Sequence, residues 1–375
     1  MTGEVYRIGI DPSKPLIHEA ETGHNRWHED IVPICEVEER QRIVIETRDA
    51  FDAQLNMSST DADVGALNLG VVHPLTGPVY VKGAEPGDLL EIKLHDIECD
   101  PWDAWGYTCE VPGFGFLRDV FPDPFMVHWY LTDEYAESPQ LPGVRIPCAP
   151  FPGIVGLAPS KDLREATIRR EADVAARGGF ALPPMEEDAV PPHGPIAEQG
   201  LRTIPPRETG GNMDIKQLTP GVSLFLPVYV EGALFSTGDV HFAQGDCEAC
   251  GTAIEMRSAM DVEFKVHKGE AARRNIRSAQ FMRGEYFTIP EMAAPRRFYA
   301  TTGMSIHADG RQESEDVTLA ARNALVSMID YLETRGFSRQ QGYAICSVAV
   351  DLRISEVVDV PNFIVSALLP LDIFM

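Results

Sequence analysis

The chain has 375 residues, of which 44% are hydrophobic and 24% charged, as in an ordinary globular protein. Its 57 acidic residues against 32 Lys and Arg give a formal net charge of −25. This charge repels phosphate backbones and anionic membranes, so we expect no nucleic-acid and no membrane partner. It suits a neutral or cationic small substrate or a divalent cation, although excess acid also simply keeps an abundant enzyme soluble.

Targeting signals and disulfides are not expected. Residues 1–10 contain no basic segment followed by an apolar run, and no apolar stretch approaches the roughly 20 residues of a membrane helix. The seven cysteines are odd in number and scattered, which favours a reducing compartment over a disulfide framework. We therefore predict a cytoplasmic protein.

Residues 1–160 are predicted to be β-rich. Residues 42–48 (RIVIETR) alternate and are rich in β-branched side chains, and short strands at 79–82 and 89–94 follow turns built on Pro and Gly. This pattern favours a β-sandwich or barrel-like body. Residues 101–127 then mix aromatic side chains with glycines, which is compatible with a pocket lining or with a loop whose rings cover a sheet edge.

Residues 161–209 are predicted to form an arm or a lid. Residues 161–177 are charged and end at a glycine pair, and residues 183–206 are rich in proline. A long excursion of this kind is unusual in a compact domain. It separates the first region from a third, at 210–375, unless these two intertwine in one domain.

The third region is predicted to be α+β. Strands are expected at 222–230, 233–242, 252–256 and 261–266, and residues 314–334 have the apolar spacing of an amphipathic helix. A strand near 343–350 and a short helix at 351–358 are expected to follow. Strands throughout and helices late argue for a β-rich α+β fold rather than an alternating one.

Polar side chains that suit catalysis concentrate between residues 210 and 256. Asn212 and Asp214 follow a glycine pair, where an Asx turn is the common alternative explanation. If 233–242 is a strand, Asp239 and His241 share one face, because side chains on a strand repeat every second residue. A hairpin turning at Gln244 and Gly245 is expected to bring a returning strand beside them, and that strand would carry Asp246 and Glu248 on one face, with Glu255 beyond.

Such a cluster of acids around an imidazole is costly unless a cation neutralises it. We therefore predict a divalent metal, with zinc preferred because His and carboxylate ligands suit it. Asp214, Asp239 and His241 are the predicted ligands, and Glu248 or Asp246 is the predicted proton carrier. Asn212 or Gln244 is expected to hold an amide or its oxyanion. A hydrogen-bonded polar turn with solvated acids explains the same spacing about as well.

Two alternatives use the same residues differently. Cys247 and Cys250 have Cys-x-x-Cys spacing, a weak metal or redox signal without a second pair, and Cys247 beside Glu248 is a possible nucleophile for a metal-independent amidase. A non-catalytic β-protein that binds a metal or ligand is the other alternative. His73 is a further candidate to complete the site, although a role in the adjacent turn explains it more simply.

Several segments together resemble the acetamidase/formamidase family. They are residues 74–88 (PLTGPVYVKGAEPGD), 111–115 (VPGFG), 210–214 (GGNMD), 238–246 (GDVHFAQGD) and 347–358 (SVAVDLRISEVV), in the family's order. The resemblance implies hydrolysis of short carboxamides to a carboxylate and ammonia by a homo-oligomer. It also implies an active site formed by Asn212, Asp214, Asp239, His241, Gln244, Asp246 and Glu248.

The sequence departs from the family pattern at two positions. The family's usual Gln-Gly-Asp-Gly-Glu is Gln-Gly-Asp-Cys-Glu here, so Cys247 adds a side chain, and His73 stands where an asparagine is usual. Both changes alter the expected pocket. The aromatic segment at 102–125 is compatible with a bulkier amide or a lactam as the substrate in place of formamide or acetamide.

Overall fold

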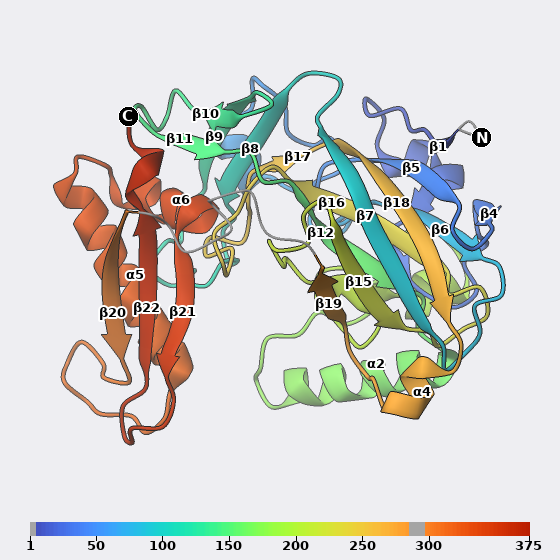
Figure 1. The fold of residues 1–375 in the computed structure, drawn as a ribbon. Helices are drawn as coiled ribbons and strands as arrows, with labels where there is room; N and C mark the ends of the chain where they lie inside the picture. The colour runs from blue at the N-terminus through green and yellow to red at the C-terminus, as the bar shows by residue number, and fades with distance from the viewer. Residues whose placement is uncertain (1–4, 285–296) are drawn as a thin grey trace.

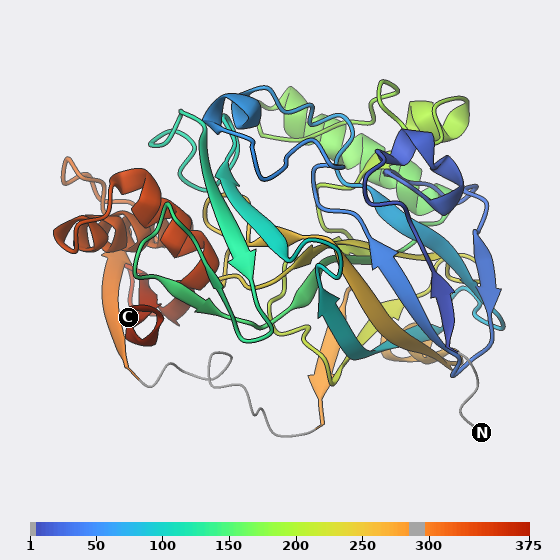
Figure 2. The ribbon, with the colours of Figure 1, turned by 90° about the horizontal axis from the view of Figure 1, so that it is seen from above.

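The computed structural model describes residues 5–284 and 297–375. The fold is α+β and rich in strands, with one body of two sheets and a C-terminal unit that has its own sheet and shares a hydrophobic core with the body (Figure 1). The predicted fold class is therefore confirmed. Seen from above, the C-terminal unit and the chain's N-terminal end lie at opposite ends of the molecule (Figure 2).

The smaller sheet of the body has six strands in the order β1-β5-β18-β7-β15-β19. Its strands are β1 (Tyr6–Ile8), β5 (Arg42–Thr47), β18 (Ser258–His267), β7 (Leu89–Cys99), β15 (Val222–Pro227) and β19 (Gln280–Arg283). The alternation predicted for 42–48 is real, because Ile43 and Ile45 are fully buried while Arg42 is exposed. The sheet combines strands from both sides of residues 161–209.

The larger sheet has eleven strands. Its main path is β11 (Arg145–Pro147), β10 (Tyr135–Glu137), β9 (Phe125–Leu131), β8 (Trp105–Glu110), β17 (Glu255–Met256), β16 (Phe235–His241), β12 (Phe151–Leu157) and β14 (Gly210–Asn212). Off this path β6 (Leu75–Val81) pairs with β16, β2 (Gly23–His24) and β4 (Cys35–Val37). The two sheets pack against each other through a shared hydrophobic core, in which the rings of Phe235 and Phe264 lie 4.9 Å apart. This packing fixes the position of β16, the strand that carries the candidate site.

Residues 161–209 contain the helix α2 (Lys161–Ala176), which Ser160 caps through its side chain, and the short helix α3 (Pro195–Gln199). Beyond them β13 (Leu201–Arg202) pairs with β3 (Arg26–Trp27). Buried Arg164 on α2 forms an ion pair with Glu29 at 2.7 Å, so the helix is held against the body. Short elements complete the body: α1 (Asp61–Gly65), α4 (Glu270–Arg274) and the 3-10 turns at Leu16–His18 and Ala20–Thr22.

The C-terminal unit has three strands, β20 (Phe298–Met304), β22 (Ile364–Pro370) and β21 (Asp351–Glu356), with α5 (Val317–Thr334) packed on one face. A 3-10 turn at Leu371–Ile373 ends it. The amphipathic helix predicted at 314–334 corresponds to α5, which Asp316 caps. Stacked rings of Tyr299 and Tyr331, 3.7 Å apart, hold β20 against this helix.

Two sequence predictions in this unit are wrong. The segment predicted as a strand near 343–350 lies in the helix α6 (Arg339–Ala349), which starts at a capping box between Ser338 and Gln341. The segment predicted as a helix at 351–358 begins with strand β21. Residues 342–349 are all buried. A helix buried on every side has no polar face, so its sequence looks like a buried strand.

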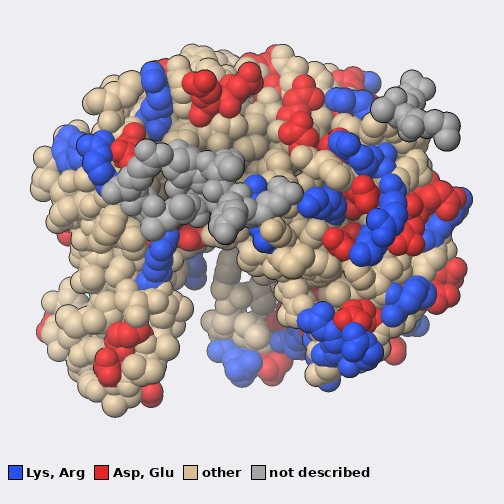
Figure 3. All heavy atoms as spheres, in the orientation of Figure 1, with Lys and Arg blue, Asp and Glu red and all other residues tan. Residues whose placement is uncertain are grey.

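Charged side chains of both signs are interspersed over the surface in Figure 3, and lysines and arginines gather around α4, the helix that carries Arg273 and Arg274. Within the described residues, no helix has the length and apolar character needed to cross a membrane.

Candidate active site

The centre of the candidate site is His241, at the end of β16. Antiparallel pairing places Glu255 of β17 directly opposite His241, and Phe151 of β12 lies on its other side with the two rings edge to face at 5.0 Å. Asp239 lies two residues earlier on the same strand, as the period-two argument predicts. All of these side chains are buried.

The orientation of the His241 ring follows from its contact with Gln244. The Nδ1 atom lies 3.0 Å from Gln244 Oε1, and the amide nitrogen of Gln244 donates to the Asp214 carbonyl at 3.0 Å. Because Oε1 only accepts, Nδ1 must donate. The remaining Nε2 then faces the acids, at 3.4 Å from Asp239 Oδ1 and 3.3 Å from Glu255 Oε2.

Glu248 and Asp214 complete a group of four carboxylates. Glu248 Oε1 lies 3.9 Å from His241 Nε2, and a carboxylate oxygen of Asp214 is within 4.8 Å of both groups. Glu248 does not reach this position from a returning strand, so the predicted hairpin is wrong. Residues 242–254 form a looped connection in which Cys247 and Glu248 have positive φ values of 107° and 47°.

Burial and mutual repulsion perturb the acids strongly. Burial, together with the charge of Asp239, raises the pKa of Asp214 and of Glu255 to about 7. Burial and the neighbouring Asp214 hold the pKa of Glu248 well above its ordinary value. Burial alone would lower the pKa of His241, but Glu255 and Asp239 outweigh it and hold that pKa well above its ordinary value. Protons and a cation are therefore alternative ways to neutralise this cluster.

The donor set fits a divalent cation. Two triads have ligand atoms within 4.8 Å of one another: Asp239, His241 and Glu255, and Asp214, His241 and Glu248. Asp214 Oδ1 and Glu255 Oε2 are buried without a hydrogen-bond partner among the described residues. Buried carboxylate oxygens are costly without a partner, and imidazole and carboxylate groups are both ligands of divalent cations, zinc among them.

A cavity of about 70 Å³ adjoins this cluster. Its acidic end is formed by Asp239, Glu248 and Glu255, and the rest of the wall is largely apolar. The residues of that wall include Ala50, Phe51, Leu69, Val72, His73, Val111, Phe114, Ile204 and Asn212. One water needs roughly 10–15 Å³ of such space, so the cavity has room for a small organic molecule.

The predicted site residues divide between the cavity and its surroundings. Asn212 lines the cavity: its amide nitrogen donates to the Ile204 carbonyl at 3.0 Å, and its buried Oδ1 has no partner among the described residues. Gln244 instead supports His241. Asp246 is outside the cluster, because its side chain accepts from Gln217 at 3.0 Å and it does not line the cavity.

His73 and Gly153 contribute more than their sequence context indicated. His73 lines the cavity, so it is more than a turn residue. A side chain at Gly153 would place its Cβ 2.7 Å from Asp214 Oδ1 and 2.8 Å from His241 Cε1, so only glycine leaves room for the cluster. Neither residue is near 210–256 in the sequence, and no local spacing could have identified Gly153. The Cys-x-x-Cys pair forms no disulfide: Cys247, which is exposed, and Cys250, which is buried, are both free.

The Acetamidase/Formamidase family model matches residues 9–375. The chain belongs to the acetamidase/formamidase family. It is 36% identical to an acetamidase of Mycolicibacterium smegmatis, over 90% of this chain and 88% of that one, and 34% identical to a formamidase of Methylophilus methylotrophus, over 94% and 89%. Like other members of the acetamidase/formamidase family, the chain is an amidohydrolase, as predicted.

Among solved structures, the chain is similar to the gamma lactamase from Delftia acidovorans. It superimposes with a TM-score of 0.93 at 34% identity, covering 98% of this chain and 93% of that one. The family fold therefore extends over the C-terminal unit as well as the body.

Proposed function

We propose that this amidohydrolase cleaves a small carboxamide to a carboxylate and ammonia with a water activated at a divalent metal, preferably zinc. The proposal is carried by the buried carboxylates around His241 Nε2 at the end of a cavity of small-molecule size, of which Asp214 Oδ1 and Glu255 Oε2 have no hydrogen-bond partner among the described residues. The names of the relatives, acetamidase and formamidase, favour a short acyl group.

Asp239, His241 and Glu255 are the residues best placed to hold the metal, with Asp214 beside them. All three are buried, whereas the Glu248 side chain is 16% exposed. When bound there, the metal supplies Lewis acidity, which polarises the amide carbonyl and lowers the pKa of water. Asp214 thus remains a candidate ligand, and Glu255 joins those predicted from sequence.

Glu248 and Asn212 have the chemistry for the remaining tasks. Glu248 lines the cavity at its acidic end, so it is positioned to take the proton from water and to deliver it to the departing amine as the C–N bond breaks. Asn212 Oδ1 is an unpartnered acceptor on the same cavity. An acceptor binds the substrate's amide N–H rather than an oxyanion, so we assign Asn212 to substrate orientation.

The metal requirement is tested with purified protein by elemental analysis and an ammonia-release assay on formamide, acetamide and propionamide. We expect close to one equivalent of divalent metal per chain, loss of activity on dialysis against chelator, and recovery with zinc. Metal-free protein with full activity would refute the metal-assisted mechanism while leaving amide hydrolysis intact.

The proton carrier is tested by comparing Glu248→Gln with Asp246→Asn. Both variants replace a carboxyl group by an amide of the same shape, but only Glu248 lines the cavity. We expect Glu248→Gln to lower kcat by at least about 100-fold, and Asp246→Asn to have a much smaller effect. The reverse order would assign the role to Asp246.

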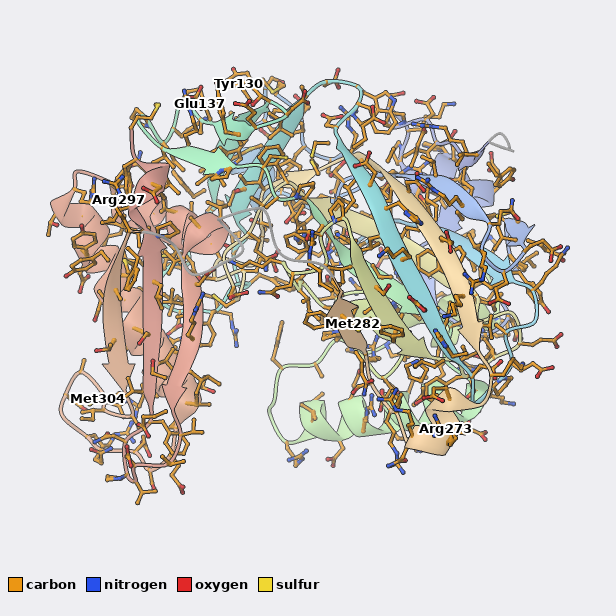
Figure 4. The ribbon with its side chains drawn as sticks, viewed as in Figure 1. Tyr130, Glu137, Arg273, Met282, Arg297 and Met304 are labelled. Carbon is orange, nitrogen blue, oxygen red and sulfur yellow. The ribbon has the colours of Figure 1, made fainter. Side chains whose placement is uncertain are left out.

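We also propose that the enzyme is a cytoplasmic homo-oligomer. Exposed apolar side chains on edge strands support self-association: Met282 on β19 is 57% exposed and Met304 on β20 is 44% exposed (Figure 4). All seven cysteines are free, which fits a reducing compartment. Light scattering after size-exclusion chromatography tests the first statement, and a monomer at micromolar concentration would refute it.

A further inference from the structure

A second, larger pocket lies directly outside the catalytic cavity. It has a volume of about 470 Å³, and Leu69, Phe114 and Ile204 form part of the wall of both spaces. Its outer wall comes from the proline-rich segment, through Leu182 and Met185. A substrate held at the acidic end of the inner cavity therefore has space to extend past these three shared side chains.

Arg202 lines this outer pocket and is only 5% exposed. One terminal nitrogen donates to the Leu69 carbonyl, the other approaches Met185 Sδ at 3.8 Å, and Nε has no partner among the described residues. No carboxylate of the described part of the chain lies within 4.0 Å of this guanidinium. A guanidinium has five N–H donors, so Arg202 keeps unused capacity for an anion.

The neighbouring Arg26 shows how a structural arginine is satisfied in the same region. It is fully buried, and its guanidinium donates to the backbone carbonyls of Asn25, Gly70, Met185 and Glu187. Arg202 has no comparable set of acceptors. Arg202 is the cationic side chain of the outer pocket, whose wall also carries the acids Glu187 and Asp188.

Burial lowers the pKa of Arg202 and the nearby charge of Asp188 opposes that shift, but neither acid of the outer pocket forms an ion pair with this guanidinium within 4.0 Å in the described part of the chain. Asp188 accepts from the side chain of Asn68 at 2.9 Å, and Glu187 is exposed to solvent. The joined pockets therefore have carboxylates and a proposed cation at the inner end and an under-used guanidinium at the outer end. The unused donors of Arg202 favour an elongated substrate that lies with its amide inward and a negative group against this guanidinium.

We propose that the outer pocket binds a carboxylate at the far end of the acyl chain, and that Arg202 receives it as a specificity-determining residue. The preferred substrate class is then the monoamides of short dicarboxylic acids. This inference rests on the proposed function for the amide end of the substrate. It assigns the outer pocket a role that hydrolysis of acetamide or formamide does not require.

The test compares primary amides of equal chain length that end in a methyl group or in a carboxylate, with three to six carbons in the acyl part. Acetamide is the reference substrate. Ammonia release gives kcat/KM for the wild-type enzyme, for Arg202→Met and Arg202→Lys, and for the control Arg170→Met. Arg170 on α2 is a surface arginine paired with Glu208, and it lines neither pocket.

For at least one chain length, we expect the wild-type enzyme to favour the carboxylate-ended amide by about tenfold or more, as a charge-assisted contact allows. Arg202→Met is expected to abolish this ratio, Arg202→Lys to retain part of it, and Arg170→Met to leave it unchanged. A wild-type preference for the methyl-ended amide at every length would overturn the proposal, and this result needs no variant. An equal loss on both substrates in Arg202→Met would also overturn it, by showing a structural role. Loss of acetamide hydrolysis on metal removal tests the proposed function separately.

Discussion

Substituting Gly153 by alanine tests whether the four acids and His241 act as one site. The added Cβ would lie 2.7 Å from Asp214 Oδ1, 2.8 Å from the Asp239 carbonyl oxygen and 2.8 Å from His241 Cε1. Ordinary contacts begin near 3.4 Å, so these groups must retreat by about 0.6–0.7 Å. Overpacking of this kind typically costs about 1–3 kcal/mol of stability. A displacement approaching 1 Å at reacting groups costs up to about 100-fold in rate.

Gly156→Ala is the matched control for this prediction. Gly156 lies on the same strand, and its added Cβ would be just as crowded, at 2.7 Å from Trp27 Cη2 and 2.9 Å from the Gly211 nitrogen, but none of its close contacts is a site side chain. Chemical denaturation and the ammonia-release assay are measured on both variants. We expect similar losses of stability, with kcat lowered by about 10- to 100-fold more in Gly153→Ala. Equal activities at equal stability would refute the idea that these groups form the catalytic centre.

Three further predictions concern strain and burial. Burial raises the pKa of Glu110, whose two oxygens have no partner among the described residues, to about 9, so the folded state keeps a proton that the unfolded state releases above about pH 4.5. The free energy of unfolding should therefore fall by about 3 kcal/mol between pH 4.5 and 7 and continue to fall until about pH 9. Denaturation curves of Glu110→Gln should show a smaller decline over this range. Cys247 has a φ of 107°, so Cys247→Gly should be more stable than Cys247→Ala by about 1 kcal/mol, and both should hydrolyse amides normally unless the thiol is the nucleophile. Gly303→Ala would place a Cβ 2.1 Å from the Ala320 carbonyl oxygen of α5, so thermal melting should show a loss of at least about 3 kcal/mol; a near-normal melting temperature would contradict this packing.

The sequence predicts the fold correctly for helices and strands that have one buried face and one solvent-exposed face. Residues 42–48 and the helix α5 have that property, and their positions agree with the structure. The helix α6 and the strand β21 were interchanged in the prediction because the local pattern lacked this contrast. Residues 342–349 are buried on all sides, so tertiary packing rather than periodicity determines that they are helical.

The candidate site was predictable only in part, for a related reason. Asp239, His241 and Glu255 lie on paired strands, and the strand pairing alone places His241 opposite Glu255, whereas Asp239 has a φ of 54°. A regular hairpin predicts Asp246 and Glu248 on one face, whereas the strand ends at His241 and residues 242–254 form a looped connection. His73 comes from a distant part of the sequence, which local spacing does not address.

The acids reach one point because the backbone departs from its preferred conformations there. Asp214, Asp239 and Glu248 have φ values of 49°, 54° and 47°, in the left-handed region that costs a non-glycine residue about 1–3 kcal/mol. The carbonyl of Asp239 would lie 2.8 Å from a Cβ at Gly153 on the paired strand, so the glycine makes this conformation of Asp239 possible. The strained backbone of Asp239 thus depends on the absence of a side chain at Gly153. Residue propensity and hydrophobic periodicity predict the conformation that each segment favours alone. Such predictions fail where contacts between segments stabilise a backbone conformation that is locally unfavourable. Asp214, Asp239 and Glu248, to which we assign part of the chemistry, are among the residues of the body that adopt such a conformation.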